Sequence, residues 1–171
     1  WDWGNDLVGL SFTSPRRDGG WLELRTGYSR FSSGLSFPDF DDTDFVSEIS
    51  QASAEADLEM RPTPYVTLTA GGGVKRLSEN NLVSTGGTEF FSGEGEGTEV
   101  SGYLQGVWRP SGDWLVEVGL RGDGWSPRTG ESAFLLSPRF SAKRFLAGSQ
   151  WAVKGSGGRY VQFLHSIRDE E

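Results

Sequence analysis

The sequence predicts an all-β fold, and more specifically an antiparallel transmembrane β-barrel of about eight strands in up-and-down order. Three observations lead to this prediction. Polar and apolar residues alternate with period two over many segments, connections between these segments alternate between short and long, and aromatic residues gather near segment ends. All three are typical of a barrel that spans an outer membrane.

The clearest alternation covers residues 51–61. One side of such a strand carries only polar residues, and the other side carries only Ala, Leu and Met. A helix would mix the two sets around its circumference, so a strand explains the segment better. Eleven residues are long for a strand of a soluble sandwich, and they match the length that a tilted membrane strand needs.

Seven further segments show weaker forms of the same pattern: 5–13, 21–30, 65–75, 99–108, 114–123, 136–144 and 151–162. In a barrel, the polar side of each strand faces the lumen. The residues expected to line the lumen are Glu55, Asp57, Glu59, Arg61, Glu117, Arg121, Asp123, Arg139, Lys143 and Lys154.

The connections divide into two classes. Residues 15–20, 62–64, 110–113 and 146–150 are short and carry turn formers, whereas 32–46, 77–97 and 125–135 are long, polar and rich in Gly. Short turns on one side and long loops on the other are the usual arrangement of an outer-membrane barrel. The chain is therefore expected to form one barrel segment over 1–171, with strand pairs at about 5–31, 46–76, 98–125 and 136–163 and no second domain.

Aromatic residues are expected to form two belts at the membrane boundaries. Trp21, Tyr65, Trp108, Trp114 and Trp151 lie beside the short turns, and Trp125 and Tyr160 lie at the opposite strand ends. Trp and Tyr favour the membrane interface because one end of each ring system is apolar and the other is polar. The alternative is that these rings close the ends of a soluble core.

Composition excludes several functions. A net charge of −8 argues against a nucleic-acid partner, and no apolar run is long enough for a transmembrane helix. Without Cys and with His165 as the single His, neither thiolate catalysis nor a His-based triad can be built. Glu117 and Asp123 could serve as an acid–base pair, but paired charges on a lumen wall explain them more simply. We expect no enzyme activity, no catalytic residue and no cofactor.

One acidic cluster deserves comparison with known metal sites. Asp39, Asp41, Asp42 and Asp44 offer the hard oxygen donors that Ca²⁺ prefers. Their spacing departs from the EF-hand loop, and a solvated acidic loop is the simpler interpretation. The sequence therefore predicts no metal site and leaves these residues as a weak calcium candidate.

Three phrases resemble the barrel of TonB-dependent receptors, the active importers of the bacterial outer membrane. Residues 61–71, RPTPYVTLTAG, resemble a periplasmic turn with its following strand; residues 137–141, SPRFS, resemble a strand opening; and residues 158–163, GRYVQF, resemble a strand end. The similarity touches most of 46–171 and covers the first 45 residues only in general pattern. It implies an outer-membrane location, contact with lipid, and uptake of a scarce ligand such as a metal chelate or glycan, powered by TonB through a plug domain.

The same resemblance implies about twenty-two strands, a plug and a box that engages TonB, none of which is recognisable in this sequence. If the short turns are periplasmic, both chain ends lie outside, which indicates a piece of a larger barrel. Two alternatives remain open: a complete small structural or adhesion barrel, and a soluble β-sandwich binding module. Partition between membrane and aqueous fractions tests the soluble module, and the flanking reading frame separates the two barrels.

Overall fold

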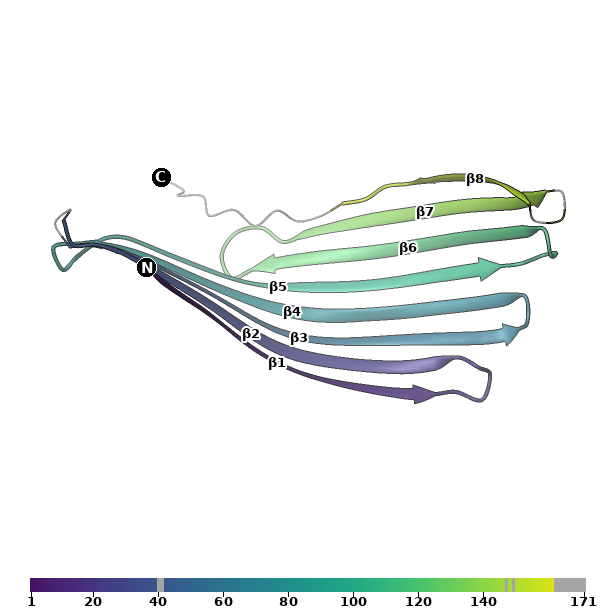
Figure 1. The fold of residues 1–171 in the computed structure, drawn as a ribbon, viewed down its shortest axis with the longest axis horizontal. Coiled ribbons are helices and arrows are strands. Elements are labelled where there is room, and N and C mark those ends of the chain that lie inside the picture. The colour runs from purple at the N-terminus through teal and green to yellow at the C-terminus, as the bar shows by residue number, and fades with distance from the viewer. Residues whose placement is uncertain (40–41, 147, 149, 162–171) are drawn as a thin grey trace.

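The computed structural model describes residues 1–39, 42–146, 148 and 150–161. These form one sheet of eight strands in sequential order: β1 (Asp2–Pro15), β2 (Trp21–Phe37), β3 (Thr43–Thr63), β4 (Val66–Thr85), β5 (Thr88–Trp108), β6 (Trp114–Pro127), β7 (Ala133–Leu146) and β8 (Trp151–Gly158). Every neighbouring pair is antiparallel (Figure 1). The all-β, antiparallel, up-and-down prediction is confirmed.

The sheet is not closed into a barrel. In the described part of the chain β1 pairs only with β2, and β8 pairs only with β7, so each has one edge without a neighbouring strand. No helix among the described residues is long and apolar enough to cross a membrane.

The register divides the side chains between two faces, because residues paired directly across neighbouring strands point to the same side. One continuous row runs through Asp57, Gly71, Tyr103, Arg121 and Ser137. The side that contains this row is called the Asp57 face. The adjacent row Leu58, Ala70, Leu104, Leu120 and Pro138 defines the opposite side, the Leu104 face.

The Leu104 face carries a band of apolar side chains across all eight strands. Its large members are Val8, Leu10, Phe12, Leu24, Tyr28, Leu58, Val66, Leu68, Val74, Val100, Leu104, Trp108, Val116, Val118, Leu120, Phe134, Leu136, Phe140 and Val153. Among the described residues no hydrophobic side chain is buried, and Leu104 itself is 59% exposed. The sheet thus has no hydrophobic core of its own, and its apolar surface lies open on one side.

The prediction of long loops at two of the three expected positions is wrong. Residues 32–46 and 77–97 belong almost entirely to strands, which continue to Phe37 and Thr43 around the first turn and to Thr85 and Thr88 around the second. The second hairpin closes on Gly86 and Gly87 with φ of 58° and 74°. Positive φ at both central residues is the geometry of a two-residue type I′ hairpin turn, which glycine adopts without strain. The strand pairs therefore run over 2–37, 43–85, 88–127 and 133–158. The first three are longer than predicted, and the fourth begins and ends earlier than the predicted 136–163.

Polar composition suggested loops, yet these residues pair because antiparallel neighbours satisfy each other's backbone groups whatever the side chains are. Residues 128–132 do form a loop between β6 and β7, within the predicted 125–135. The predicted strand end at 159–163 is not a strand at Arg159 to Val161, and residues 162 and 163 lie outside the described part. In Figure 1 the short turns lie together on the right, and the two long hairpins reach farthest to the left.

Candidate functional site

The ten residues predicted from alternation lie on the Asp57 face. The register places nine of them there directly: Glu55, Asp57, Glu59, Glu117, Arg121, Asp123, Arg139, Lys143 and Lys154. Arg61 follows a register shift that begins at Met60, and its guanidinium contacts Glu59 at 2.8 Å. One face of the sheet therefore gathers charges that lie far apart in sequence.

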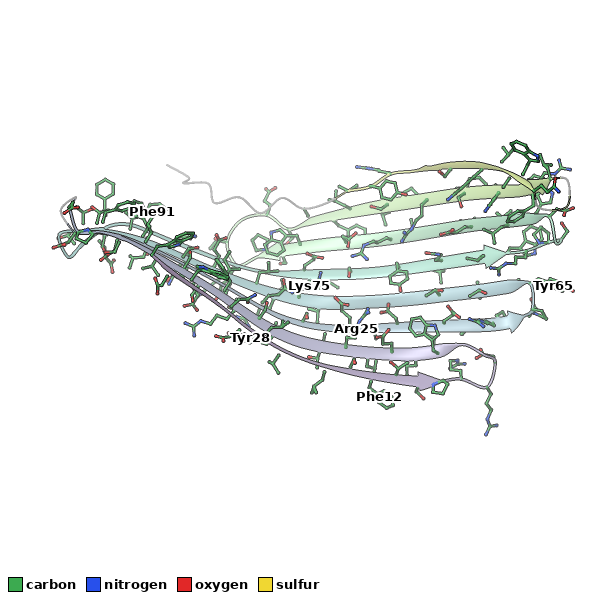
Figure 2. All side chains as sticks on the ribbon, in the orientation of Figure 1. Phe12, Arg25, Tyr28, Tyr65, Lys75 and Phe91 are labelled. Carbon is green, nitrogen blue, oxygen red and sulfur yellow. The ribbon has the colours of Figure 1, made fainter. Side chains whose placement is uncertain are left out.

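Arg25 on β2 is the centre of the densest charge cluster. Its Nη2 lies 2.5 Å from Asp57 Oδ2 and 3.2 Å from Glu55 Oε2, and its Nη1 lies 3.8 Å from Glu23 Oε2. The Tyr103 hydroxyl donates to the second Asp57 oxygen at 2.6 Å. Asp57 is 7% exposed, so this carboxylate is buried beneath its donors rather than beneath a hydrophobic layer. Figure 2 labels Arg25 on β2, partway along the strand.

Gly71 makes this arrangement possible. It sits between Asp57 and Tyr103 in the same row, and a Cβ added at Gly71 would overlap both the carboxylate and the tyrosine ring. The absence of a side chain lets Tyr103 cross β4 to reach β3. Gly97 leaves space for Trp125 in the same way, because a Cβ added at Gly97 would overlap the Trp125 indole. Glycine in a strand commonly marks such a close approach.

A second charge pair lies on β6. Arg121 Nε donates to both oxygens of Asp123, at 2.9 and 3.0 Å, and its Nη2 lies 2.7 Å from Oδ1. Asp123 is 8% exposed. Guanidinium and phenol donors thus hold the carboxylates of Asp57 and Asp123 in fixed positions.

Sequence reasoning missed Arg25 and Tyr103. Arg25 was identifiable, since it alternates with Leu24 and Thr26 in a predicted strand. Tyr103 had no comparable signal, because its role depends on which residues the register places on β4 and β3.

Toward β7 and β8 the Asp57 face becomes basic. Lys143 lies directly opposite Lys154, and Lys143 Nζ lies 4.5 Å from the centre of the Phe145 ring. The Arg139 side chain lies over Gly119 on β6. Within the described ranges none of these three cations forms an ion pair.

The predicted aromatic belt residues separate by face. Trp108, Trp114 and Trp151 lie on the Leu104 face beside the short turns, and Tyr65 lies in the β3–β4 turn. Trp21 and Trp125 point instead to the Asp57 face, opposite Glu59 and Glu99, because their positions are odd in strands whose apolar positions are even. Tyr160 follows the end of β8 and is exposed. A belt on the Leu104 face would therefore exclude Trp21 and Trp125.

The outer part of the two long hairpins, residues 29–37, 43–51, 77–85 and 88–97, is called the hairpin extension. There the two faces exchange character. The Asp57 face carries Phe31, Leu35, Phe37, Phe45, Ile49, Leu77, Val83 and Phe91, and Phe37 meets Phe45 edge-to-face at 6.1 Å.

The Leu104 face of the extension is mainly polar, with charges such as Arg30 and Glu48, which are 2.6 Å apart, and one apolar pair, Val46 and Leu82. The β2–β3 ladder has no register shift anywhere, so the exchange results from the sequence and not from a slip in pairing. Phe91 is labelled near the tip of this extension in Figure 2.

Little supports the weak calcium candidate. Asp42 lies in the β2–β3 turn with φ of 47°, Asp39 precedes it, Asp44 lies on β3, and Asp41 is outside the described residues, as is His165. Across 1–39, 42–146, 148 and 150–161 no three acidic or His residues come together to hold a metal ion.

Comparison with known proteins finds no match among family models, curated proteins or solved structures.

Proposed function

We propose that this chain forms part of the wall of an outer-membrane β-barrel, with the Leu104 face toward lipid and the Asp57 face toward the lumen. One observation carries this proposal: the sheet has an exposed apolar band on one face and charged side chains on the other. None of its described residues buries a hydrophobic side chain. A sheet in water would need a second layer over such a surface, whereas lipid covers it without one.

The dimensions of the band fit a bilayer. On β4 the apolar positions extend over the nine residues from Val66 to Val74. A strand that crosses a bilayer at a tilt of about 45° needs roughly 9–11 residues. Trp108, Trp114 and Trp151 lie at the short-turn end of the band, where interfacial aromatic residues are expected.

Within this class we propose a TonB-dependent receptor that mediates ligand uptake. The three sequence phrases that resemble that family support the assignment, as does an open sheet whose edges call for further strands. The charged Asp57 face suits contact with a plug domain and water. The hairpin extension, with aromatic side chains on the same face, would stand above the lumen where a ligand arrives from outside.

Charge substitutions on neighbouring residues test the membrane part of the proposal. Leu104 and Gln105 are adjacent on β5 and point to opposite faces. Leu104→Arg places a cation near the middle of the band and should lower the free energy of unfolding by about 2–4 kcal/mol in a bilayer. Gln105→Arg adds the same cation to the charged face and should have little effect. Urea unfolding of the chain in lipid bicelles gives both values, and equal effects of the two substitutions would contradict the proposed orientation.

Photo-crosslinking in intact cells tests the importer part. The protein expressed from the reading frame that contains this chain should crosslink to TonB. It should also stay in the membrane fraction after carbonate extraction. A membrane barrel without a TonB crosslink would retain the lipid-facing wall and reject the importer.

A further inference from the structure

At the boundary between the apolar band and the hairpin extension, two arginines share one carboxylate. Arg76 Nη2 and Arg128 Nη1 each lie 3.5 Å from the same oxygen, Glu96 Oε2. The Arg128 amide donates to the Glu96 carbonyl at 2.8 Å, which continues the β5–β6 ladder by one more pair. All three side chains therefore lie on the Leu104 face.

The charge of this group is not balanced. Two guanidinium groups meet a single carboxylate, which leaves one positive charge in excess. The ion pairs are long, and the side chains of Arg76 and Arg128 are 70% and 72% exposed, so most of their donors face outward. Arg30, elsewhere on the same face, is balanced by Glu48 at 2.6 Å and also lies opposite Asp6. The Arg76–Glu96–Arg128 group is therefore open to an additional anion.

Its surroundings are amphipathic. One step toward the short turns, the same face presents Val74, Val100 and Phe134, all exposed. Thr98 and Ser126 lie beside Arg76 in its own row and add hydroxyl groups. An amphiphile whose chain lay on Val74, Val100 and Phe134 would bring its polar head to the arginines.

We propose that Arg76 and Arg128 bind the phosphate of an anionic lipid headgroup through the positive charge that Glu96 leaves unbalanced. This inference rests on the proposed lipid contact of the Leu104 face. Guanidinium groups recognise phosphate oxygens through forked, charge-assisted hydrogen bonds. Arginines at the edge of a membrane-spanning surface lay their stems on apolar neighbours and extend their charge to headgroup level.

The test is native mass spectrometry of the chain released from bicelles of phosphatidylcholine and phosphatidylglycerol in equal amounts. Phosphatidylglycerol should be retained about fivefold over phosphatidylcholine, whose choline cation cancels its phosphate charge. The double variant Arg76→Gln/Arg128→Gln should abolish this preference, and Glu96→Gln should increase it. Lys75→Gln is the matched control, since Lys75 precedes Arg76 but points to the Asp57 face.

The site would be established if the arginine variant lowers the preference for phosphatidylglycerol, the glutamate variant raises it, and Lys75→Gln leaves it unchanged. An unchanged preference in the double variant, or an equal loss in the lysine variant, would overturn it. Loss of the preference on adding inorganic phosphate would show a site for free anions and would also overturn the lipid assignment. Failure to associate with either lipid, by contrast, is a failure of the proposed membrane wall itself.

Discussion

Gly71 decides where Tyr103 can lie. The tyrosine begins on β5, crosses β4 above the glycine and donates to Asp57 on β3, so one side chain joins three strands. A hydrogen bond to a carboxylate is stronger than one between neutral groups, and here the carboxylate is also held by Arg25. The stability of the charged face thus depends on a position that has no side chain.

Gly71→Ala should lower the free energy of unfolding by about 1–3 kcal/mol, because its Cβ would overlap the Asp57 carboxylate and the Tyr103 ring. Gly102→Ala is the matched control: its nearest neighbour would be the Gly71 carbonyl oxygen at 3.9 Å, an ordinary contact. Urea unfolding in bicelles gives both values. Similar behaviour of the two variants would show that Tyr103 does not need the space.

Asp18 makes the β1–β2 turn sensitive to acid. Partial desolvation opposes ionisation of its carboxyl group, but the Gly20 amide at 3.2 Å and the Arg16 guanidinium at 3.4 Å outweigh it and lower the pKa of Asp18 below its usual value. A lowered pKa in the folded state stabilises the fold above the unfolded-state pKa, and this stabilisation disappears as the pH falls through the folded-state pKa.

Asp18→Asn should therefore reduce stability near neutral pH and have no effect in strong acid, where Asp18 itself is protonated. The asparagine side chain keeps one carbonyl oxygen that can accept from the Gly20 amide, so the substitution removes the charge and one acceptor oxygen. Urea midpoints of the two proteins across the acidic range provide the measurement. A difference that stays constant down to the lowest pH would mean that the charge plays no part.

The sequence predicts the strands correctly within the apolar band, but it predicts loops where the strands continue beyond the band. In the band, Ala52 to Met60 alternate with charges, and the pattern is unmistakable. In the extension the apolar residues move to the other face, and Ser, Gly and Asn dilute them, so the segments read as loops. The signal that identifies the hairpin is Gly86-Gly87, which suits a type I′ turn.

Gly87→Ala tests that turn. Gly87 has φ of 74° and nothing within 4 Å of an added Cβ, so the substitution introduces backbone strain alone, of about 1 kcal/mol. Gly112 in the β5–β6 turn has the same free space without positive φ, and Gly112→Ala should be nearly neutral. Amide exchange should show faster opening of residues 77–97 only for Gly87→Ala. Unchanged exchange there would exclude a strained turn.

Sequence reasoning has a clear limit at the candidate sites. Period-two alternation identifies which residues share a face, and this suffices for Glu55, Asp57 and Asp123. It does not give the register between strands, which alone brings Tyr103 to Asp57 and Arg76 to Glu96. Those partners lie 46 and 20 positions apart, and no local pattern relates them.

The molecule as a whole is a sheet with two free edges. The backbone of an edge strand offers unpaired N–H and C=O groups to any other strand. β1 and β8 are such edges among the described residues, and both carry exposed apolar side chains, including Val8 and Val153. In a larger barrel further strands would cover both edges.

We expect the isolated chain to self-associate through these edges. The double variant Val8→Lys/Val153→Lys places a charge on each edge strand and should shift the chain toward monomers. Val118→Lys on the interior strand β6 has comparable exposure and should not. Sedimentation velocity in a detergent that covers the Leu104 face separates the two outcomes. A monomeric wild-type chain in water without detergent would refute the expectation.

The uninterrupted β2–β3 ladder also constrains how this chain can change over evolutionary time. It runs from Trp21 opposite Glu59 to Phe37 opposite Thr43 without a shift. Inserting one residue into either strand would invert every side chain of that strand beyond it, which would move phenyl rings to the Leu104 face and charged groups to the Asp57 face. Insertions of two residues in each strand preserve both surfaces. Insertions within the ladder of homologous hairpins should therefore come in multiples of four residues, whereas one additional pair at the tip adds two residues and turns no existing side chain.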